Sequence, residues 1–322
     1  MTALQSCSES GPRSPACIAC GGRTESTGVI RAMDGLFVRA AYGGPLRGRW
    51  DLVRCARCGL EFRWPLPSQE VLTAAYSRMP ATLWQARPLG CWSKVRAELA
   101  RLAPGRRVLD VGCYCGAFLD WLGPGWERCG VEPSEEAAAE ARRVGVSIVG
   151  PDVACLERLD EEFDAMVMMD LLEHVAGPVA ALRSAWRALR PGGVLVIVTG
   201  NADALPWRLY GTDYYYCRLP EHVVFFRPGW FKWLCGELPF ELARVTPLRH
   251  NAWRLGPWLG WAARYAVWLP VVLYGRLRLR SECSPFVNRY AALLRGLAPG
   301  PGDPARDHML VSLRKLPAGR KG

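Results

Sequence analysis

The sequence predicts an α/β protein in which an open, Rossmann-like sheet follows a small cysteine-rich module. An apolar stretch runs into a glycine turn and a helix at residues 107–122, and alternating strand and helix patterns continue to residue 248. Two Cys-x-x-Cys-Gly pairs stand within the first 60 residues. Alternating strands and helices are typical of a parallel sheet covered by helices on both faces. The 322 residues suffice for one such domain and a small module.

The composition excludes several classes of protein. Hydrophobic residues make up 50% of the chain and charged residues 22%, with 14 Trp, which is too apolar for a largely disordered protein. No apolar run of about 20 residues lacks a charge, so we expect no clean transmembrane helix. The first 20 residues have no apolar stretch like that of a secretory signal. We therefore expect a cytoplasmic protein whose 13 cysteines are thiols or metal ligands rather than disulfides.

The two cysteine pairs predict a zinc ribbon over residues 1–67. In each pair two thiolates can reach a single ion, and the glycine that follows permits the tight turn. Two pairs supply four thiolates, the ligand set of a closed, structural zinc site. Between them, Gly28–Ala32 and Trp50–Val53 alternate as the strands of β-hairpins do. Four free buried thiols or an iron–sulfur cluster are the alternatives, but the spacing favours zinc. The predicted ligands are Cys17, Cys20, Cys55 and Cys58.

Residues 68–104 predict a helical linker or cap. The preceding stretch Phe62–Pro67 should be extended, because each proline disfavours helix at the residue before it. Ser68 is then the predicted N-cap of a helix that ends at Arg78. A second predicted helix, Trp92–Leu102, leads into the main domain.

The stretch Arg107–Gly116 is the most informative part of the chain. A short buried strand, Val108–Val111, runs into the turn Gly112-x-x-x-Gly116 and then into a helix, Ala117–Leu122. Such a turn brings a ligand close to the backbone at a helix N-terminus. The glycine spacing differs from the Gly-x-Gly-x-x-Gly of dinucleotide sites, and Asp110 would repel a pyrophosphate. The same carboxylate attracts a cation, so the turn predicts S-adenosylmethionine (SAM), with its amino group beside a sulfonium, rather than NAD.

A second acid stands at the end of the next predicted strand. The stretch Cys129-Gly-Val-Glu132 ends 16 residues after the glycine turn, and an acid at this place can bind the two hydroxyls of a ribose. Ser134 is the predicted N-cap of the helix 135–144, which has acids in its first turn and arginines in its last.

These residues resemble the cofactor motifs of class I SAM-dependent methyltransferases. Asp110 and the two glycines match the first motif, with Tyr114 where the family usually has its middle glycine. The resemblance implies that Glu132 binds the ribose hydroxyls and that Asp152 faces the adenine amino group. The implied cofactor site comprises Asp110, Gly112, Cys113, Gly116, Glu132, Pro133, Asp152 and Asp170.

The resemblance covers residues 105–248 and is similar in detail to ubiquinone-type O-methyltransferases and many glycan or natural-product methyltransferases. Some of these carry an N-terminal zinc ribbon. It implies a seven-stranded class I methyltransferase (Rossmann-like) sheet within residues 105–322, with a basic, Trp-rich helical insertion at 249–305 before the last strand. The further strands expected in this sheet are 146–149, 163–170, 194–199, 240–246 and 308–314.

Four residues are candidates for chemistry at the acceptor. The methyl donor is already activated, so the protein must align the acceptor, and an oxygen acceptor also benefits from a general base. His222 is the preferred base because a histidine titrates near neutral pH; its alternative role is to pack or cap the next helix. His174 belongs to a Glu-His pair that recurs in relatives with different substrates, which favours a structural role. Asp170, Glu173 and His174 follow the fourth strand, and together with His222 they could instead hold Mg²⁺ or another divalent ion.

Two aromatic segments have both a functional and a structural interpretation. Asn201–Tyr216 faces the acceptor in relatives, although Trp207 and Tyr214–Tyr216 suit core packing equally. Residues 249–322 hold 13 Lys and Arg against 3 acids, so they carry +10 of the net charge of +11. The run 250–280 combines Trp and Arg, which predicts either peripheral membrane contact or a helical cap.

We expect a SAM-dependent methyltransferase that methylates a hydroxyl of a saccharide or secondary metabolite. The alternatives are an RNA base methyltransferase, a sugar C-methyltransferase and a SAM-binding module without catalysis. RNA is disfavoured because Asp170-Leu-Leu-Glu stands after the fourth strand, where methylation of an exocyclic amine requires an Asn/Asp-Pro-Pro-aromatic signature. We therefore expect a small-molecule or glycan acceptor and no nucleic acid, and the sequence leaves the oligomeric state open.

Overall fold

The computed structural model of the chain describes residues 14–33, 46–77, 90–249 and 306–317. The predicted basic insertion, residues 249–305, lies outside this part except for its first residue, and so does the run 250–280. Within the described ranges, no helix combines the length and the apolar character that crossing a bilayer requires.

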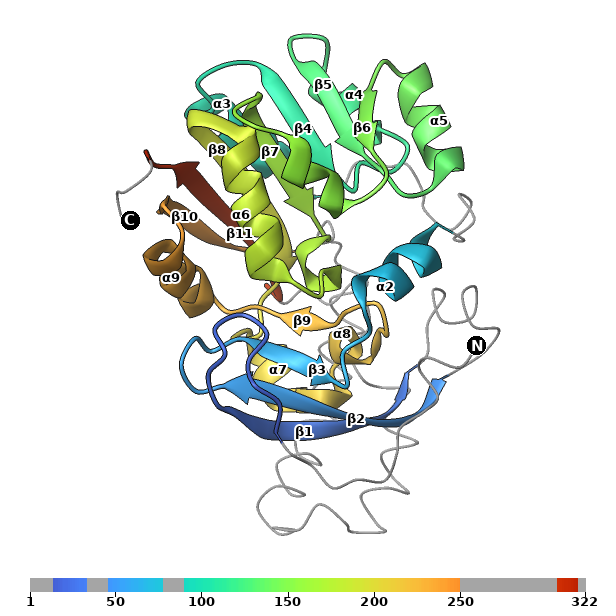
Figure 1. Cartoon of the computed structure of the whole chain (residues 1–322), viewed down its shortest axis with the longest axis vertical. Helices are drawn as coiled ribbons and strands as arrows, with labels where there is room; N and C mark the ends of the chain where they lie inside the picture. The colour runs from blue at the N-terminus through green and yellow to red at the C-terminus, as the bar shows by residue number, and fades with distance from the viewer. Residues whose placement is uncertain (1–13, 34–45, 78–89, 250–305, 318–322) are drawn as a thin grey trace, which may run out of the picture.

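Seven strands form the larger of two sheets (Figure 1). In spatial order they are β10 (Phe240–Leu248), β11 (His308–Lys315), β8 (Leu189–Gly200), β7 (Phe163–Met169), β4 (Arg107–Val111), β5 (Glu127–Val131) and β6 (Ser147–Gly150). Neighbours from β8 to β6 are parallel, whereas β11 is antiparallel to both β8 and β10. The strand order reverses at β4, and ligands of such sheets bind beside the point of reversal. The predicted seven-stranded α/β sheet is confirmed.

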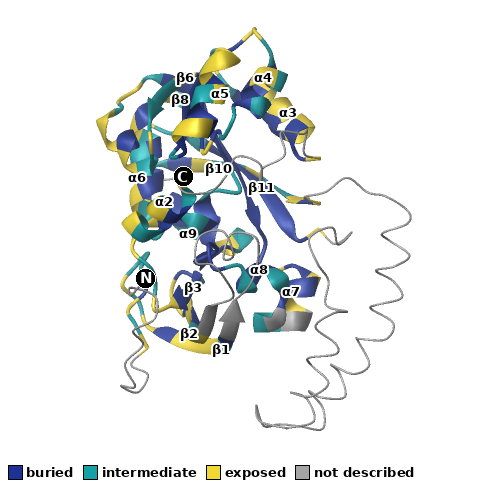
Figure 2. Cartoon of the chain, turned by 90° about the vertical axis from the view of Figure 1, so that its right-hand side faces the viewer, coloured by how far each residue is buried: buried dark blue, intermediate teal, exposed yellow. Residues whose placement is uncertain are grey.

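Helices cover both faces of this sheet. They are α3 (Trp92–Leu102), α4 (Ala117–Leu122), α5 (Glu135–Arg143), α6 (Pro178–Ala188) and α9 (Pro228–Glu237). Every second side chain of β8, from Val194 on, packs with α3, α4 and α5, and those between, from Leu195 on, pack with α6 and α9. Burial on both faces explains the nearly continuous apolar sequences of β7 and β8. Figure 2 shows these buried strands in dark blue inside helices with exposed, yellow outer positions.

The smaller sheet joins the N-terminal residues to a distant segment of the chain. Its antiparallel strands are, in order, β1 (Thr24–Met33), β2 (Leu46–Cys55), β3 (Glu61–Trp64) and β9 (Val224–Phe225). The pairing of β1 with β2 confirms the hairpin expected between the two cysteine pairs. In Figure 1, β9 lies between β3 and the larger sheet. The cysteine-bearing module therefore shares hydrogen bonds with the segment that follows His222.

Aromatic side chains close the space behind the smaller sheet. Two short helices lie there, α7 (Leu205–Tyr210) and α8 (Tyr215–Arg218). Trp207, Tyr214 and Tyr216 pack with Trp50 of β2 and are at most 4% exposed. Of the two interpretations of Asn201–Tyr216, core packing describes these three rings.

The helix α2 (Gln69–Tyr76) connects the two sheets. Ser68 occupies its N-cap position as predicted, but the serine side chain makes no capping hydrogen bond. Gln69 Oε1 accepts a hydrogen bond from the N–H of Ala176 at 3.0 Å, and the Tyr76 hydroxyl lies 2.8 Å from His174 Nδ1. These two contacts fix α2 against the segment that follows β7, where the acceptor chemistry was expected.

Candidate active site

Three carboxylates meet at one edge of the larger sheet. Asp110 belongs to β4, Glu132 directly follows β5, and Asp170 directly follows β7. Because these strands are parallel neighbours, their carboxyl ends lie side by side. The predicted cofactor residues on three strands therefore converge on the expected edge of the sheet.

The glycine turn after β4 has the left-handed backbone that its sequence predicts. Gly112 has a φ of +82° and Gly116, the N-cap of α4, a φ of +74°. Tyr114 adopts a φ of +50°, so it takes the left-handed conformation of the glycine that it replaces. This conformation costs a bulky residue on the order of 1 kcal/mol. The turn therefore keeps its shape at the expense of local strain.

Asp110 is a buried carboxylate with an unsatisfied oxygen, an environment that suits a cationic ligand. Its side chain is 2% exposed, and its Oδ1 has no hydrogen-bond partner. Burial, and secondly the negative charge of Glu132, raise the pKa of Asp110 to about 7. A buried acceptor without a donor is costly unless a ligand supplies one. The amino group beside the sulfonium of SAM has the donors and the charge that this oxygen lacks.

Glu132 ties the glycine turn to the start of α5. Its Oε2 accepts a hydrogen bond from the N–H of Tyr114 and its Oε1 one from the N–H of Ser134, both at 2.9 Å. Burial raises the pKa of Glu132, and these two bonds oppose that effect. Each carboxylate oxygen can accept a second hydrogen bond, so ribose hydroxyls fit the same carboxylate. Ser134 caps α5 as predicted, since its side chain accepts from Ala137.

The other predicted cofactor residues lie around this turn with different orientations. The Cys113 side chain packs beneath Gly130, where an added Cβ would lie 2.4 Å from its Sγ, so only the Cys113 backbone belongs to the turn surface. Pro133 is half-buried beside Glu132. Asp152 caps the 3-10 helix Val153–Arg158 by accepting from the N–H of Ala154 at 3.0 Å.

Glu173, His174 and His222 form a compact cluster on the acceptor side. One ligand-type atom of each lies within 4.8 Å of those of the other two. Glu173 and His174 come from the 3-10 helix Leu172–His174 after β7, and His222 comes from the loop before β9. Asp170 is not a member of this cluster among the described residues. Its backbone is left-handed, with a φ of +49°, a conformation that asparagine and aspartate tolerate better than other non-glycine residues.

The carboxylate of Glu173 is held on both sides. Its Oε1 accepts from the Tyr216 hydroxyl at 2.5 Å and its Oε2 from the Thr199 hydroxyl at 2.8 Å. The side chain is 1% exposed. Glu173 therefore anchors the cluster rather than projecting freely toward an acceptor.

The hydrogen bonds of the two histidines define their tautomers. His174 Nδ1 lies 2.8 Å from the carbonyl oxygen of Glu221, and His222 Nδ1 lies 3.1 Å from that of Tyr216. A carbonyl only accepts, so each Nδ1 carries a proton, and the neutral ring of His222 has its lone pair on Nε2. The ring centroids of the two histidines are 4.8 Å apart. The Nε2 of His222 is thus in the state that proton abstraction or metal binding requires.

The expectation that His222 titrates near neutral pH is wrong in this environment. Burial, followed by electrostatic interactions with His174 and Arg63, lowers the pKa of His222 well below its ordinary value of 6.5. His222 is 7% exposed, so its imidazolium form is poorly solvated. The histidine is therefore neutral over the whole physiological range.

Sequence reasoning missed Tyr76 and Arg63 as residues of this site and gave Glu221 no role of its own. Tyr76 contacts His174 across 98 residues of sequence. Burial raises the pKa of Glu221, and its Oε2 has no hydrogen-bond partner. Arg63 lies in β3, 2% exposed. The partners of Tyr76 and Arg63 lie far away in the sequence, and no local motif marks these two residues.

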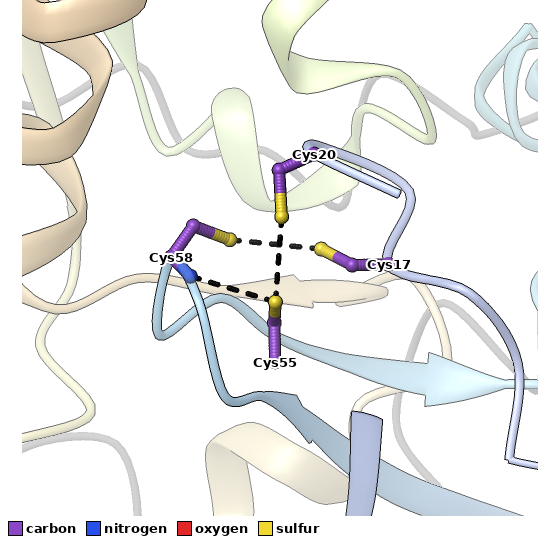
Figure 3. A group of neighbouring side chains, drawn as sticks. All are labelled: Cys17, Cys20, Cys55 and Cys58. Carbon is purple, nitrogen blue, oxygen red and sulfur yellow. Dashed lines mark hydrogen bonds between the residues drawn. The ribbon is translucent and has the colours of Figure 1, made fainter. Parts of the chain in front are cut away.

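The four predicted zinc ligands converge on one point (Figure 3). The Sγ atoms of Cys17 and Cys58 are 3.6 Å apart and those of Cys20 and Cys55 are 3.4 Å apart. A tetrahedron with zinc–sulfur bonds of about 2.3 Å has edges of about 3.8 Å, so the spacing fits a four-thiolate metal site. Backbone N–H groups of Ala19, Arg57 and Cys58 point at the sulfurs, at 3.3 to 3.5 Å.

Glycines shape the cysteine cluster as expected. Gly21 and Gly59, which follow the two pairs, have φ values of +67° and +74°. A Cβ on Gly22 would lie 3.2 Å from the sulfurs of both Cys20 and Cys55. A hydrogen bond from the Cys58 thiol lowers the pKa of Cys17 to about 5, and the same contact raises the pKa of Cys58. Crowded thiols that share protons in this way are relieved when a cation replaces the protons.

Comparison with known proteins identifies the main part of the chain. A family model described as "Methyltransferase domain" matches residues 84–245. A ubiquinone biosynthesis O-methyltransferase from Thiobacillus denitrificans is 29% identical over 174 residues, which cover 50% of this chain and 73% of the relative. The enzyme of the same name from Xanthomonas campestris is 31% identical over 185 residues, covering 52% and 77%.

Among solved structures, a SAM-dependent methyltransferase from Archaeoglobus fulgidus is 18% identical, with a TM-score of 0.43, and the match covers 70% of this chain and 94% of that one. The family match spans half of the chain, and the relative with 31% identity is matched over three quarters of its length. The chain belongs to the class I SAM-dependent methyltransferases.

Proposed function

We propose that this methyltransferase methylates a hydroxyl oxygen of a saccharide or secondary metabolite, with His222 as the general base. The single observation that carries the proposal is the state of His222. The ring is neutral, its Nδ1–H is held by the Tyr216 carbonyl, and its Nε2 carries a lone pair next to His174 and Glu173. Glu173 and His174 follow β7, the strand beside the cofactor turn, and His222 joins them from the loop before β9.

The cofactor half supplies binding and orientation. SAM brings a methyl group that is already activated on a sulfonium. In this proposal the orphaned oxygen of Asp110 accepts from the SAM amino group, and Glu132 accepts from the ribose hydroxyls. Asp152 faces the adenine amino group, and the exposed backbone at Gly112 admits the close approach of the ligand.

The acceptor half removes one proton. As the acceptor oxygen forms its bond to the methyl carbon, His222 Nε2 takes the hydroxyl proton, and the methyl–sulfur bond breaks to leave the neutral thioether. His174 is held by the Glu221 carbonyl and by Tyr76, so that it orients His222. The His222 ring is buried, which limits the access of competing water.

The cysteine cluster is proposed to hold a structural zinc ion. All four ligand positions are filled by Cys17, Cys20, Cys55 and Cys58, which leaves no open position for a substrate. The zinc therefore acts on the fold of the smaller sheet and not on the transferred methyl group.

A divalent cation at Glu173, His174 and His222 is the second candidate, because their ligand atoms gather within 4.8 Å. Glu173 already accepts hydrogen bonds at both oxygens, so it would have to share them with the ion. Methyl transfer that disappears after chelator treatment and returns with Mg²⁺ or Mn²⁺ would favour this arrangement. Transfer that is indifferent to chelator would remove it, provided the zinc content is unchanged.

We place this reaction in the cytoplasm, on a small-molecule or glycan acceptor. The relatives are named as O-methyltransferases of ubiquinone biosynthesis, so their names concern O-methylation of a small molecule. Membrane contact through residues 250–280 would favour an amphiphilic acceptor, but that run lies outside the described residues.

The test uses SAM with a radiolabelled methyl group and cell extract separated into organic-soluble, small aqueous and nucleic-acid fractions. The proposal expects label in a small-molecule fraction, lost with His222→Ala, and an oxygen-bound methyl in the product by NMR. A methyl on carbon would establish the sugar C-methyltransferase instead. Label in RNA would overturn the proposal. Asp110→Asn is the control that weakens SAM binding.

A further inference from the structure

Arg63 is a buried cation whose partners are backbone carbonyls. It lies in β3 of the cysteine-bearing module and is 2% exposed. Its Nη1 donates to the carbonyl of Pro220 at 2.8 Å, and its Nη2 donates to the carbonyls of Cys217 at 2.9 Å and Leu219 at 2.8 Å. Among the described residues, no carboxylate lies within ion-pair distance of it. Burial lowers the pKa of Arg63 only to about 10, so it remains charged at neutral pH.

Packing alone does not account for a guanidinium in this position. A buried charge without a carboxylate partner is costly, and an apolar side chain of similar volume often serves stability equally well. What an apolar side chain cannot do is donate to three carbonyls at once. The forked, planar guanidinium does this with a fixed geometry. The function of Arg63 therefore concerns the segment that carries these carbonyls.

That segment is the loop that carries His222. The Leu219 carbonyl accepts from Arg63 and also from the N–H of His222 at 3.1 Å. The Tyr216 carbonyl, one residue before the Arg63 contacts begin, accepts from His222 Nδ1 at 3.1 Å. The loop thus turns its carbonyls toward two side chains, Arg63 and His222. The position of the imidazole depends on the same loop carbonyls that Arg63 binds.

A chain of backbone hydrogen bonds runs parallel to the side-chain contacts. The N–H of Arg63 donates to the Val223 carbonyl at 3.0 Å, and the N–H of Val223 donates to the Glu173 carbonyl at 2.9 Å. β3 therefore connects through Val223 to the 3-10 helix that holds Glu173 and His174. Both sides of the acceptor cluster are linked to one residue of the N-terminal module.

The positive charge of Arg63 also affects the pKa values of its neighbours. It is among the causes that lower the pKa of His222 and among those that oppose the raised pKa of Glu221. A cation close to an imidazole disfavours the imidazolium, so it keeps His222 neutral between turnovers.

We propose that Arg63 is a positioning residue for methyl transfer, which holds the loop 217–220 so that His222 presents its Nε2 to the acceptor. The inference rests on the proposed role of His222 as general base. It also gives the cysteine-bearing module a role in catalysis, because the residue that sets the position of the base belongs to a strand of that module.

The test compares Arg63→Met and Arg63→Lys with Arg227→Met in the full chain. Arg227 is a matched control, since it also joins the two parts of the molecule through a partly buried contact, with Glu61 at 2.6 Å, while its Nε donates to Asp203 rather than to a carbonyl of the loop 217–220. The chain has only 4 histidines, so histidine side-chain NMR can follow His222 directly after assignment with His222→Gln. Zinc content and SAM affinity by calorimetry report on the rest of the molecule.

With Arg63→Met we expect unchanged zinc content and SAM affinity within about twofold, because the hydrogen bonds of Arg63 go to residues 217–223 and not to the cofactor half. The His222 signal should lose the Nδ1–H tautomer pattern, and its pKa should rise toward the ordinary value. Transfer to the labelled extract fraction should fall about 100-fold, the scale of a small misplacement of a reacting group. In Arg63→Lys the pKa of His222 should return toward the wild-type value more fully than its tautomer pattern, since the ammonium of lysine keeps the charge but lacks the forked N–H donors of the guanidinium.

Wild-type His222 signals and wild-type transfer in Arg63→Met would overturn the inference. Equal changes in Arg227→Met would do the same, because they would show a general effect of loosening the module. If Arg63→Met does not fold, Arg63→Lys decides on the same readings. If His222→Gln transfers methyl groups normally, the proposed function fails, while the NMR comparison still decides whether Arg63 positions His222.

Discussion

The cofactor half and the acceptor half of this active site are assembled in different ways. The cofactor half lies almost entirely within residues 107–134, where two strands, two turns and two helix N-termini follow one another. The acceptor half draws on α2, on the 3-10 helix Leu172–His174, on the loop before β9 and on β3. Short-range structure thus holds the donor, and long-range contacts hold the base. The two halves should therefore fail separately when they are perturbed.

The largest difference between the effects on methyl transfer and on SAM affinity should follow from loss of the cysteine site. Cys20→Ser should abolish zinc binding and unfold the smaller sheet, because structural zinc contributes on the order of 10 kcal/mol in small zinc modules. We expect methyl transfer to vanish while SAM affinity falls less than about tenfold. Metal analysis, circular dichroism and calorimetry check this, with Cys235→Ser as a control cysteine outside the cluster. Equal loss of SAM binding and transfer would mean that the halves are not separable.

Asp110→Asn should break the opposite half. A hydrogen bond to a charged group contributes about 1.5–3 kcal/mol, so SAM affinity should fall roughly ten- to hundredfold. The histidine signals of His174 and His222 should stay unchanged, since Asp110 is not among the groups that shift the pKa of His222. Calorimetry and histidine NMR measure both. Normal SAM affinity in this variant would remove Asp110 from the cofactor site.

The stability of the SAM-free protein should also depend on Asp110 and pH. The pKa of Asp110 is raised from 3.8 to about 7 in the folded chain, so between these values the folded state binds more protons than the unfolded state. The free energy of unfolding should therefore carry a contribution that falls as pH rises from about 4 to about 7. Asp110→Asn should lack this contribution, and SAM should reduce it by favouring the carboxylate. Urea denaturation across this range, with and without SAM, tests the sign.

Ser134 and Ser68 form a matched pair of helix caps. The Ser134 side chain accepts from Ala137, whereas Ser68 makes no capping bond. Ser134→Ala should lower the free energy of unfolding by about 1 kcal/mol, and Ser68→Ala by only a few tenths. Chemical denaturation measures both differences. An equal loss in the two variants would contradict the assigned capping geometry.

A comparably small effect on stability concerns Tyr114. Its φ of +50° is strained, so Tyr114→Gly should raise the free energy of unfolding relative to Tyr114→Ala by about 1 kcal/mol. The alanine variant keeps the strain but loses the ring, so the difference isolates the backbone. Identical stability of the two variants would mean that the turn relaxes without the glycine.

The cofactor half was predictable because its signals are local. The predicted helices Trp92–Leu102 and 117–122 have the bounds found in the structure, and the Ser134 cap and both turn glycines behave as expected. Hydrophobic period, caps and glycine turns each act within a few residues. The cysteine ligands were predictable for the same reason, because each Cys-x-x-Cys pair is a local motif.

The acceptor half could be predicted only in part. His174, Glu173 and His222 were identified as candidates, but their hydrogen bonds were not, because they connect residues up to about 100 positions apart. Arg63 contacts a loop 157 residues away in the sequence through carbonyls, which carry no side-chain signature. β9 has two residues, too short for any periodic pattern. The environment that lowers the pKa of His222 arises only after these segments pack together.

The most direct test of His222 as the general base is the rate of methyl transfer by His222→Gln at saturating SAM. The rate is measured in single turnover on the acceptor fraction that the wild-type enzyme labels. If His222 is the base, the variant should bind SAM with the affinity of the wild type, and its methyl transfer should be slower by a factor of about 10² to 10⁴, the usual contribution of a general base. A wild-type rate in this variant would contradict the assignment of His222 and with it the division of labour between the two halves.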